Sequence, residues 1–228
     1  MTFKDLTELW EKYKQKHGDD AYRYISELLR EAKGLHRRDF LKNPTPAGDH
    51  EQSWRAFKGK NLEKLVAYII RDEVGSLGLR IVDGNTLDRT NSKNLSRELG
   101  AVKRNLSVDY GEFGLHFPDL DIIIYEPRSC KVIAGISSKV TLRERIAQTG
   151  YWKIKLSEAE ATKHVKVFFV TPDEDGTLST RTPVKKGRAI VEVDTDGSYV
   201  MNETQVEESQ RVKMFDKFID DLRRLASG

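Results

Sequence analysis

Three short apolar runs in the middle of the chain constrain its fold more than any other feature. They are "DIIIY" (121–125), "KVIAGISSKV" (131–140) and "HVKVFFV" (164–170). A turn separates the first two runs, whereas a segment with helical spacing, about 142–156, lies between the last two. Short strands interrupted by a helix predict an α/β fold with a mixed central sheet flanked by helices.

Helical segments are predicted before this sheet. Apolar residues recur at helical spacing over residues 3–16 and again over 22–29, and a longer stripe predicts a helix over 53–74. Residues 35–52 contain two prolines and no sustained period, so we expect a loop there. This loop separates an N-terminal helical segment, 1–50, from a core over 51–228, although the two can also form one continuous domain.

The C-terminal part continues the alternation of strands and helices. Residues 188–201, "RAIVEVDTDGSYVM", predict a hairpin with Asp-Gly at its turn. The apolar spacing over 206–225 predicts a C-terminal amphipathic helix.

Composition excludes several classes of protein. Cys130 is the one cysteine and the five histidines are scattered, which excludes a disulfide framework and argues against a structural zinc site. No apolar run approaches the length needed to span a membrane, and the first residues have no apolar signal core. We therefore expect a soluble, cytoplasmic protein with no membrane partner.

Acidic and basic side chains enter two of the predicted strands. Alternate residues of a strand share a face, so Ser137 and Lys139 lie on one face of their strand, and Asp119 and Asp121 lie on one face of theirs. If the two strands are neighbours joined by the turn "EPRSCK", then Asp121 and Lys139 converge. A carboxylate that can bind Mg²⁺ beside a lysine that stabilises charge on phosphorus suits phosphodiester hydrolysis.

The same residues resemble the motifs of the PD-(D/E)XK nuclease superfamily, with "PDLD" as the first half and "SSK" as the second. The continuation "SSKVTLRERIAQ" resembles the Ser/Cys-x-Lys-x-Thr-x-Lys/Arg-Asp/Glu-Arg-x-x-Gln pattern of type II restriction endonucleases. The similar branch cuts CCGG- or CCNGG-like sites and includes the BsaWI-type enzymes. The resemblance covers about residues 117–155, and the matching positions are Lys139, Thr141, Arg143, Glu144, Arg145 and Gln148.

This resemblance implies a restriction-endonuclease-like core and a Mg²⁺-dependent, sequence-specific endonuclease for double-stranded DNA. It implies that Lys139 is the catalytic lysine, that Asp121 binds the metal and that Arg145 is an active-site residue. Cutting both strands at a short symmetric site calls for two active sites related by a two-fold axis, so we expect a homodimer. A cognate DNA methyltransferase is expected as a partner in the restriction-modification system rather than in a complex.

One position departs from the family pattern, because Ser137 stands where an acid is usual. Relatives with this serine place an acid elsewhere, and the candidates here are Glu63, Glu144 and Glu158. We take Glu63 as the second metal ligand and catalytic residue, because it stands at the edge of the apolar stripe in 53–74. Asp119, Ser137 and Glu144 are supporting candidates.

Each assignment has a structural alternative. Thr141 and Glu144 also form a capping box, which we prefer for Glu144. Lys139 could protect an edge strand, and Arg145 could form a buried ion pair with Asp121. Glu63 could be a solvated partner of nearby basic residues on its own helix.

Two other functions stay open for the whole chain. A DNA repair or recombination nuclease could share this core, and a non-catalytic DNA-binding module could retain the scaffold. The candidates for DNA contact, which could also be solvated, are Arg143, Gln148, Arg181, Lys185, Lys186 and Arg188.

Overall fold

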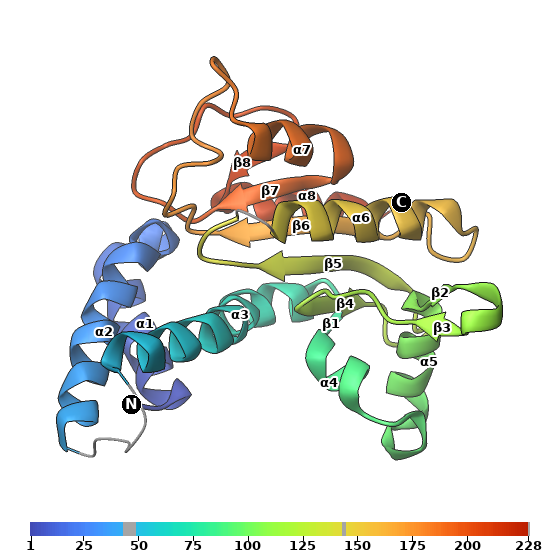
Figure 1. Ribbon diagram of the computed structural model, residues 1–228, viewed down its shortest axis with the longest axis horizontal. Coiled ribbons are helices and arrows are strands. Elements are labelled where there is room, and N and C mark those ends of the chain that lie inside the picture. Colours follow the sequence, from blue (N-terminus) through green and yellow to red (C-terminus); the bar gives the residue numbers. More distant parts are fainter. Residues whose placement is uncertain (43–48, 143–144, 228) are drawn as a thin grey trace.

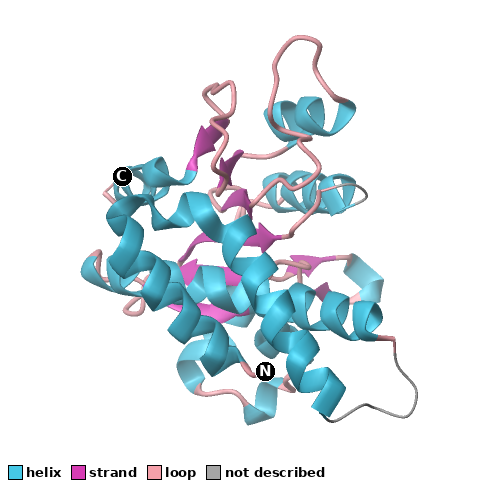
Figure 2. Cartoon of the chain, turned by 90° about the vertical axis from the view of Figure 1, so that its left-hand side faces the viewer, coloured by secondary structure: helices cyan, strands magenta, loops and turns pink. Residues whose placement is uncertain are grey.

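The computed structural model describes residues 1–42, 49–142 and 145–227. Three long helices form an arm on one side of the molecule (Figure 1). They are α1 (Phe3–His17), α2 (Ile25–Lys42) and α3 (His50–Ser76), with the 3-10 helix η1 (Gly18–Tyr24) between the first two. Figure 2 views the arm face on, with the helices in front of the strands.

The loop predicted over residues 35–52 is wrong at both ends. α2 continues to Lys42, and α3 begins at His50, where the Asp49 side chain accepts a hydrogen bond from the N–H of Glu51. The buried face of α2 extends to His36, whose ring lies 5.6 Å from the ring of Trp54 on α3. A hydropathy pattern counts this histidine as polar, which is why the helix looked shorter in the sequence.

A six-stranded sheet in the order β1-β4-β5-β6-β7-β8 forms the centre of the fold. Its strands are β1 (Arg80–Asp83), β4 (Ile122–Tyr125), β5 (Val132–Ser138), β6 (Lys166–Thr171), β7 (Gly197–Val200) and β8 (Val212–Met214). β1, β4 and β5 are antiparallel neighbours, whereas β5 to β8 run parallel. The predicted α/β fold with a mixed sheet is confirmed.

Shorter helices surround the sheet (Figure 1). They are α4 (Gly84–Arg89), α5 (Arg97–Leu106), α6 (Arg145–Glu158), α7 (Lys186–Asp194) and α8 (Phe218–Ala226), with the 3-10 helices η2 (Ser92–Asn94), η3 (Gly111–Phe113) and η4 (Phe215–Lys217). β2 (Val108–Asp109) and β3 (Leu115–His116) form a separate two-stranded ribbon. In Figure 1 the arm and the α4–α5 pair flank the β1 end of the sheet.

β4 is buried on both faces. Ile122 and Ile124 belong to the larger apolar cluster, which they share with the N-terminal helices, while Ile123 and Tyr125 belong to a second cluster with α4 and α5. This double burial matches the continuous apolar run in the sequence. Asp121 is therefore attached to one of the most firmly packed elements of the fold.

The N-terminal segment and the end of the chain share the larger cluster. The rings of Tyr22 in η1 and Phe215 in η4 lie 5.6 Å apart, and both residues are buried. The boundary near residue 50 stays a prediction.

The hairpin predicted over 188–201 is wrong. Residues Lys186–Asp194 form α7, and only β7 is a strand, pairing in parallel with β6. Asp-Gly therefore marks the entry from a helix into a strand rather than a hairpin turn. Gly197 is needed there because its φ is 140° and a Cβ would lie 2.4 Å from the carbonyl oxygen of Arg211.

The C-terminal helix is shorter than predicted. β8 and η4 take up residues 212–217, and α8 begins only at Phe218. Val212, Phe215, Phe218 and Leu222 are buried, but Val212 is buried as a strand residue against β7. The sequence shows one continuous apolar pattern over β8 and α8, because both elements contribute buried residues to the same larger cluster.

Candidate active site

Asp121 is fixed where β4 begins, between its two neighbouring strands. Its backbone N–H donates to the carbonyl of Ile136, and its carbonyl accepts from the N–H of Gly84, both at 2.9 Å. The residue is 3% exposed. Because β5 on one side and the start of α4 on the other satisfy both backbone groups, the carboxylate has a defined position at this end of the sheet.

Lys139 follows the last residue of β5 and reaches Asp121. Its Nζ lies 2.8 Å from the carboxylate, and the N–H of Ser138 donates to the same carboxylate at 2.7 Å. The register that sets Ile122 opposite Ile136 brings these segments together. The predicted convergence of Asp121 and Lys139 is confirmed. The edge-strand alternative for Lys139 is wrong, because β5 lies between β4 and β6.

Glu63 extends from α3 toward the same pair. Burial is the largest cause that raises the pKa of Glu63 to about 7, and the charge of Asp121 and a hydrogen bond with its side chain add to the effect. The ammonium of Lys139 acts in the opposite direction. The alternative that Glu63 is only a solvated partner on its own helix does not fit this position.

Asp83 is an acidic residue near the site that the sequence analysis missed. It ends β1 opposite Ile122, caps α4 by accepting a hydrogen bond from the N–H of Thr86 at 2.6 Å, and raises the pKa of Glu63. The sequence signal was the pair Asp-Gly after the short apolar run "LRIV". That signal shows a strand end, but only the pairing of β1 with β4 places it beside Asp121.

Arg145 lies at the rim rather than in the interior. Its guanidinium donates to Asp119 at 3.3 Å and to the side-chain oxygen of Gln148 at 2.9 Å, and the Gln148 amide donates to Asp119 at 2.6 Å. The Arg145 side chain is 52% exposed. The buried pair with Asp121 that we considered for Arg145 is therefore wrong, and Asp119 is its partner.

The other candidates for the acid missing at Ser137 differ in their position relative to Asp121. Glu158 pairs with Lys155 at the far end of α6, 2.8 Å away, so it does not reach Asp121. Ser137 is buried within β5. Arg143 and Glu144 lie outside the described residues. Among the described candidates for the missing acid, Glu63 is the one beside Asp121.

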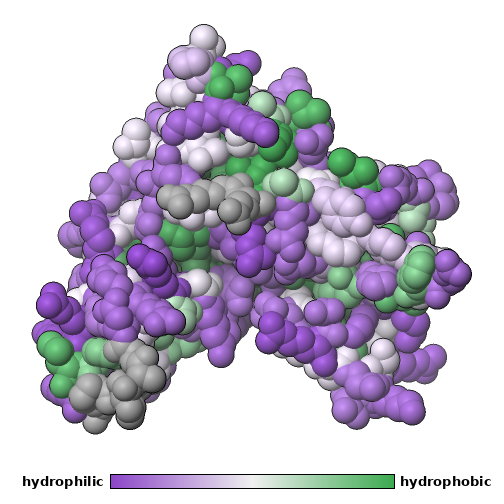
Figure 3. Space-filling model, in the orientation of Figure 1, coloured by the Kyte–Doolittle hydropathy of each residue, from purple (hydrophilic) through white to green (hydrophobic). Residues whose placement is uncertain are grey.

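Asp121, Lys139 and Glu63 line one cavity of about 1410 Å³. α3 lines one side of it, and β1 with α4 lines another; Asp119 and Arg145 also contribute. Figure 3 shows the surface notched between the helical arm and the α4–α5 part, with mostly hydrophilic residues around the notch. The cavity is open enough for an extended polar ligand.

The basic loop that was predicted to contact DNA lies elsewhere. Arg181, Lys185 and Lys186 are exposed, and Lys185 donates to the carbonyls of Asp175 and Gly176. None of these described residues lines the cavity that holds Asp121.

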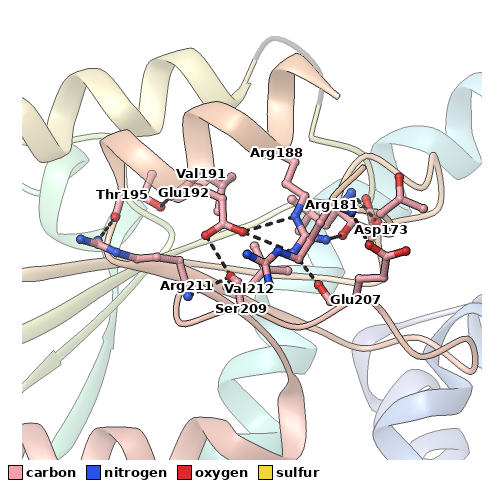
Figure 4. Close-up of polar contacts among 12 residues, drawn as sticks. Asp173, Arg181, Arg188, Val191, Glu192, Thr195, Glu207, Ser209, Arg211 and Val212 are labelled. Atoms are coloured by element: carbon pink, nitrogen blue, oxygen red, sulfur yellow. Dashed lines mark hydrogen bonds and ion pairs between the residues drawn. The ribbon is translucent and has the colours of Figure 1, made fainter. Parts of the chain in front are cut away.

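Arg188 has no exposed surface. It donates to the carbonyls of Leu178 and Glu207 and to the carboxylate of Glu192 (Figure 4). A phosphate contact by Arg188, predicted from the sequence, does not fit this burial. Arg188 instead connects the loops around α7 through these hydrogen bonds.

The sequence of the chain matches known proteins over most of its length. A protein of Methanocaldococcus jannaschii named as the type II restriction enzyme MjaVIP is 39% identical over 176 residues, which are 75% of this chain and 76% of that protein. Residues 98–221 match the family described as BsaWI restriction endonuclease type 2. The chain belongs to this BsaWI family of type II restriction endonucleases, enzymes that act on DNA.

Solved structures share the fold. The structure described as the specific complex of restriction endonuclease AgeI with DNA has a TM-score of 0.57 at 16% identity, over 98% of this chain and 91% of that one. The complex of restriction endonuclease PspGI with substrate DNA has a TM-score of 0.54 at 14% identity, over 97% and 93%. The arrangement around β1, β4 and β5 is thus a restriction-endonuclease fold. No described helix is long and apolar enough to cross a membrane.

Proposed function

We propose that this chain is a Mg²⁺-dependent endonuclease that hydrolyses phosphodiester bonds at specific sites in double-stranded DNA. The observation that supports this most directly is the Lys139 ammonium 2.8 Å from the Asp121 carboxylate, in a cavity that Glu63 also lines. An acid and a lysine held together by neighbouring strands suit an enzyme that must bind a cation and stabilise an anionic transition state. Asp121, Lys139, Glu63 and Arg145 form the proposed catalytic group.

The side chains present fit Mg²⁺. Asp121 and Glu63 provide carboxylate oxygens, the ligands that Mg²⁺ prefers, and a cation between them would relieve the repulsion that helps raise the pKa of Glu63. The described residues hold no group of three or more His, Cys, Asp or Glu arranged for a metal ion. Two carboxylates are compatible with Mg²⁺ because this ion usually keeps several waters. When bound, Mg²⁺ acidifies a coordinated water and neutralises phosphate charge.

The residues of the chain have separate roles in this proposal. Lys139 donates hydrogen bonds to the attacking water or to a phosphate oxygen, where negative charge develops. Arg145 offers a half-exposed guanidinium at the rim for a phosphate, and Asp119 with Gln148 holds it there. Ser137 is a buried residue of β5, two positions before Lys139.

Cutting both strands of duplex DNA at a short symmetric site calls for two active sites related by a two-fold axis, so we expect a homodimer. A restriction enzyme requires protection of the host DNA, so a cognate methyltransferase is the expected partner in the same system. We expect the enzyme to act in the cytoplasm, where it meets incoming DNA.

The decisive experiment incubates plasmid DNA with the purified chain and Mg²⁺, beside EDTA and beside Lys139→Ala and Asp121→Ala. We expect discrete fragments with Mg²⁺, none with EDTA, and none from either variant. Cutting that persists in both variants would refute the assignment of the site. A smear, or cutting restricted to branched DNA, would support a structure-directed repair nuclease instead, and duplex binding without any nicking would support a non-catalytic DNA-binding module.

A further inference from the structure

One face of α3 lines the cavity beyond the proposed catalytic group. Its contributing residues recur at intervals of three or four over much of the helix, as residues of a single helical face do. They are Gly59, Lys60, Glu63, Lys64, Ala67, Arg71 and Gly75. Glu63 serves the reacting centre in the proposal above, which leaves Lys60, Lys64 and Arg71, here called the α3 stripe, without a role.

The α3 stripe is not neutralised within the part of the chain that the structure describes. Lys60 is exposed and has no ion pair there; Lys64 lies over the ring of Phe3 and Arg71 over the ring of Tyr68. Two other cations of α3 lie outside the cavity lining, and they differ from each other: Arg55 is exposed and forms no ion pair with the described residues, whereas Lys58 is paired. The Lys58 ammonium lies 3.1 Å from Glu174. Of the four lysines and arginines of α3 that form no ion pair with the described residues, three line the cavity.

The opposite wall repeats this arrangement. Arg89 of α4 is exposed, lines the cavity and forms no ion pair with the described residues. Arg80, also in the wall, is already held by both oxygens of Glu98 at 2.8 and 2.9 Å. Arg89 is therefore the cation of this wall that is available to a ligand.

The charges of the whole cavity favour a polyanion. Its lining has seven basic residues and four acidic ones, and the acidic residues are Glu63, Asp83, Asp119 and Asp121. Lys139 and Arg145 form ion pairs with two of these acids. The α3 stripe and Arg89 form no ion pair with the described residues. A cavity that holds these cations as well as the acids matches a ligand with many anionic groups, of which one reaches the acids.

We propose that the α3 stripe and Arg89 bind the sugar–phosphate backbone of DNA on the two sides of the reacting centre. This inference rests on the proposed function and identifies the residues that position its substrate. From Lys60 to Arg71 the helix rises about 16 Å, at 1.5 Å per residue. One DNA strand has a phosphate about every 3.4 Å along the axis, so the α3 stripe can follow several consecutive phosphates. These contacts set register and affinity rather than sequence preference.

The test measures binding without cleavage. A fluorescently labelled duplex of about 30 base pairs with random sequence is titrated in EDTA over a series of salt concentrations, because each phosphate contact adds about 0.9 to the salt slope of binding. The variants are Lys60→Ala/Lys64→Ala and Arg89→Ala. Lys58→Ala is the matched control, because it removes the same charge from α3 outside the cavity.

We expect the salt slope to fall by about 1.8 in the double variant and by about 0.9 in Arg89→Ala, with no change in Lys58→Ala. Thermal melting should be unchanged, since the removed side chains are exposed or half-buried. Slopes equal to that of the wild type in both cavity variants would overturn the inference and leave the proposed function intact. A wild-type chain that binds no duplex in this assay would also overturn the inference, whereas the proposed function would be overturned by the absence of Mg²⁺-dependent plasmid cleavage.

Discussion

Gly84 and Asp121 are joined by a 2.9 Å hydrogen bond from the N–H of the glycine to the carbonyl of the aspartate. The approach of the two segments is so close that a Cβ at Gly84 would lie 1.8 Å from the carbonyl oxygen of Leu120. The start of α4, directly after β1, therefore helps to position the Asp121 carboxylate, although it adds no residue to the Lys139 pair. The link explains how a distant glycine can control the proposed metal ligand.

Gly84→Ala should damage the site more than the fold. The added methyl group must push the backbone of Leu120 and Asp121 away, and overpacking of this kind costs about 1–3 kcal/mol. A displacement near 1 Å at a reacting group lowers rates by about 10²-fold. Single-turnover cleavage and thermal melting of the same preparation measure the two effects.

The matched control is Gly34→Ala on α2, where a Cβ meets no atom within 4 Å. Gly34 is exposed inside a helix, so alanine should raise the free energy of unfolding by about 0.5–1 kcal/mol and leave cleavage unchanged. If Gly84→Ala cleaved as fast as Gly34→Ala, the Gly84 contact at the start of α4 would have no part in positioning Asp121.

Glu63 should be the acid that replaces the one missing at Ser137. Glu63→Gln keeps the shape of the side chain but removes a proposed ligand, so the Mg²⁺ concentration needed for half-maximal cleavage should rise by about tenfold or more. The measurement is a Mg²⁺ titration of plasmid cleavage. Glu158→Gln is the control because Glu158 pairs with Lys155 at the far end of α6.

The comparison also covers Glu144, which lies outside the described residues. Glu144→Gln belongs in the same titration. A larger Mg²⁺ requirement in Glu144→Gln or Glu158→Gln than in Glu63→Gln would transfer the role of the missing acid to that residue.

The metal-free protein should lose stability as the pH rises through the range in which Glu63 ionises. Its pKa is raised from 4.5 to about 7, first by burial and then by Asp121. Between these two values the folded state binds more protons than the unfolded state, so the free energy of unfolding falls as the pH increases. Urea denaturation in EDTA between pH 5 and pH 8 should show this decrease, and Glu63→Gln should flatten it.

Mg²⁺ gives the complementary measurement. If Asp121 and Glu63 bind the ion, adding Mg²⁺ at pH 8 should restore more stability to the wild type than to Glu63→Gln, because a ligand that binds only the folded state stabilises it. Identical pH profiles for the two proteins in EDTA would show that Glu63 does not titrate in this range.

The pairing of Asp121 with Lys139 could be predicted because it depends on local sequence. Both strands are short, the turn "EPRSCK" joins them directly, and alternation along a strand gives the facing side chains. Asp83 and the cavity walls could not be found in this way. They depend on β1 pairing with β4 and on α3 crossing beside them, and these contacts join segments that no local pattern connects.

The errors near the C-terminus have a different cause. Asp-Gly at 196–197 is a common hairpin signal, but Asp196 instead accepts a hydrogen bond from the N–H of Val167 at 2.9 Å and guides β7 into a parallel register. Arg188 looked like part of a basic surface run, since nothing in the sequence shows that its partners are two distant carbonyls and Glu192. Tertiary contacts therefore determine both the conformation at Asp196–Gly197 and the burial of Arg188.

Arg188→Met should destabilise the protein without affecting the active site directly. The substitution leaves the carbonyls of Leu178 and Glu207 and part of the Glu192 carboxylate without their donor. Removing one partner of a buried charged pair costs about 3–5 kcal/mol. Urea denaturation should show this loss, whereas the exposed neighbour Lys186→Ala should stay within about 0.5 kcal/mol of the wild type. Arg188→Met with normal stability and a smaller salt slope of DNA binding would instead restore the sequence-based assignment of Arg188 to the DNA interface.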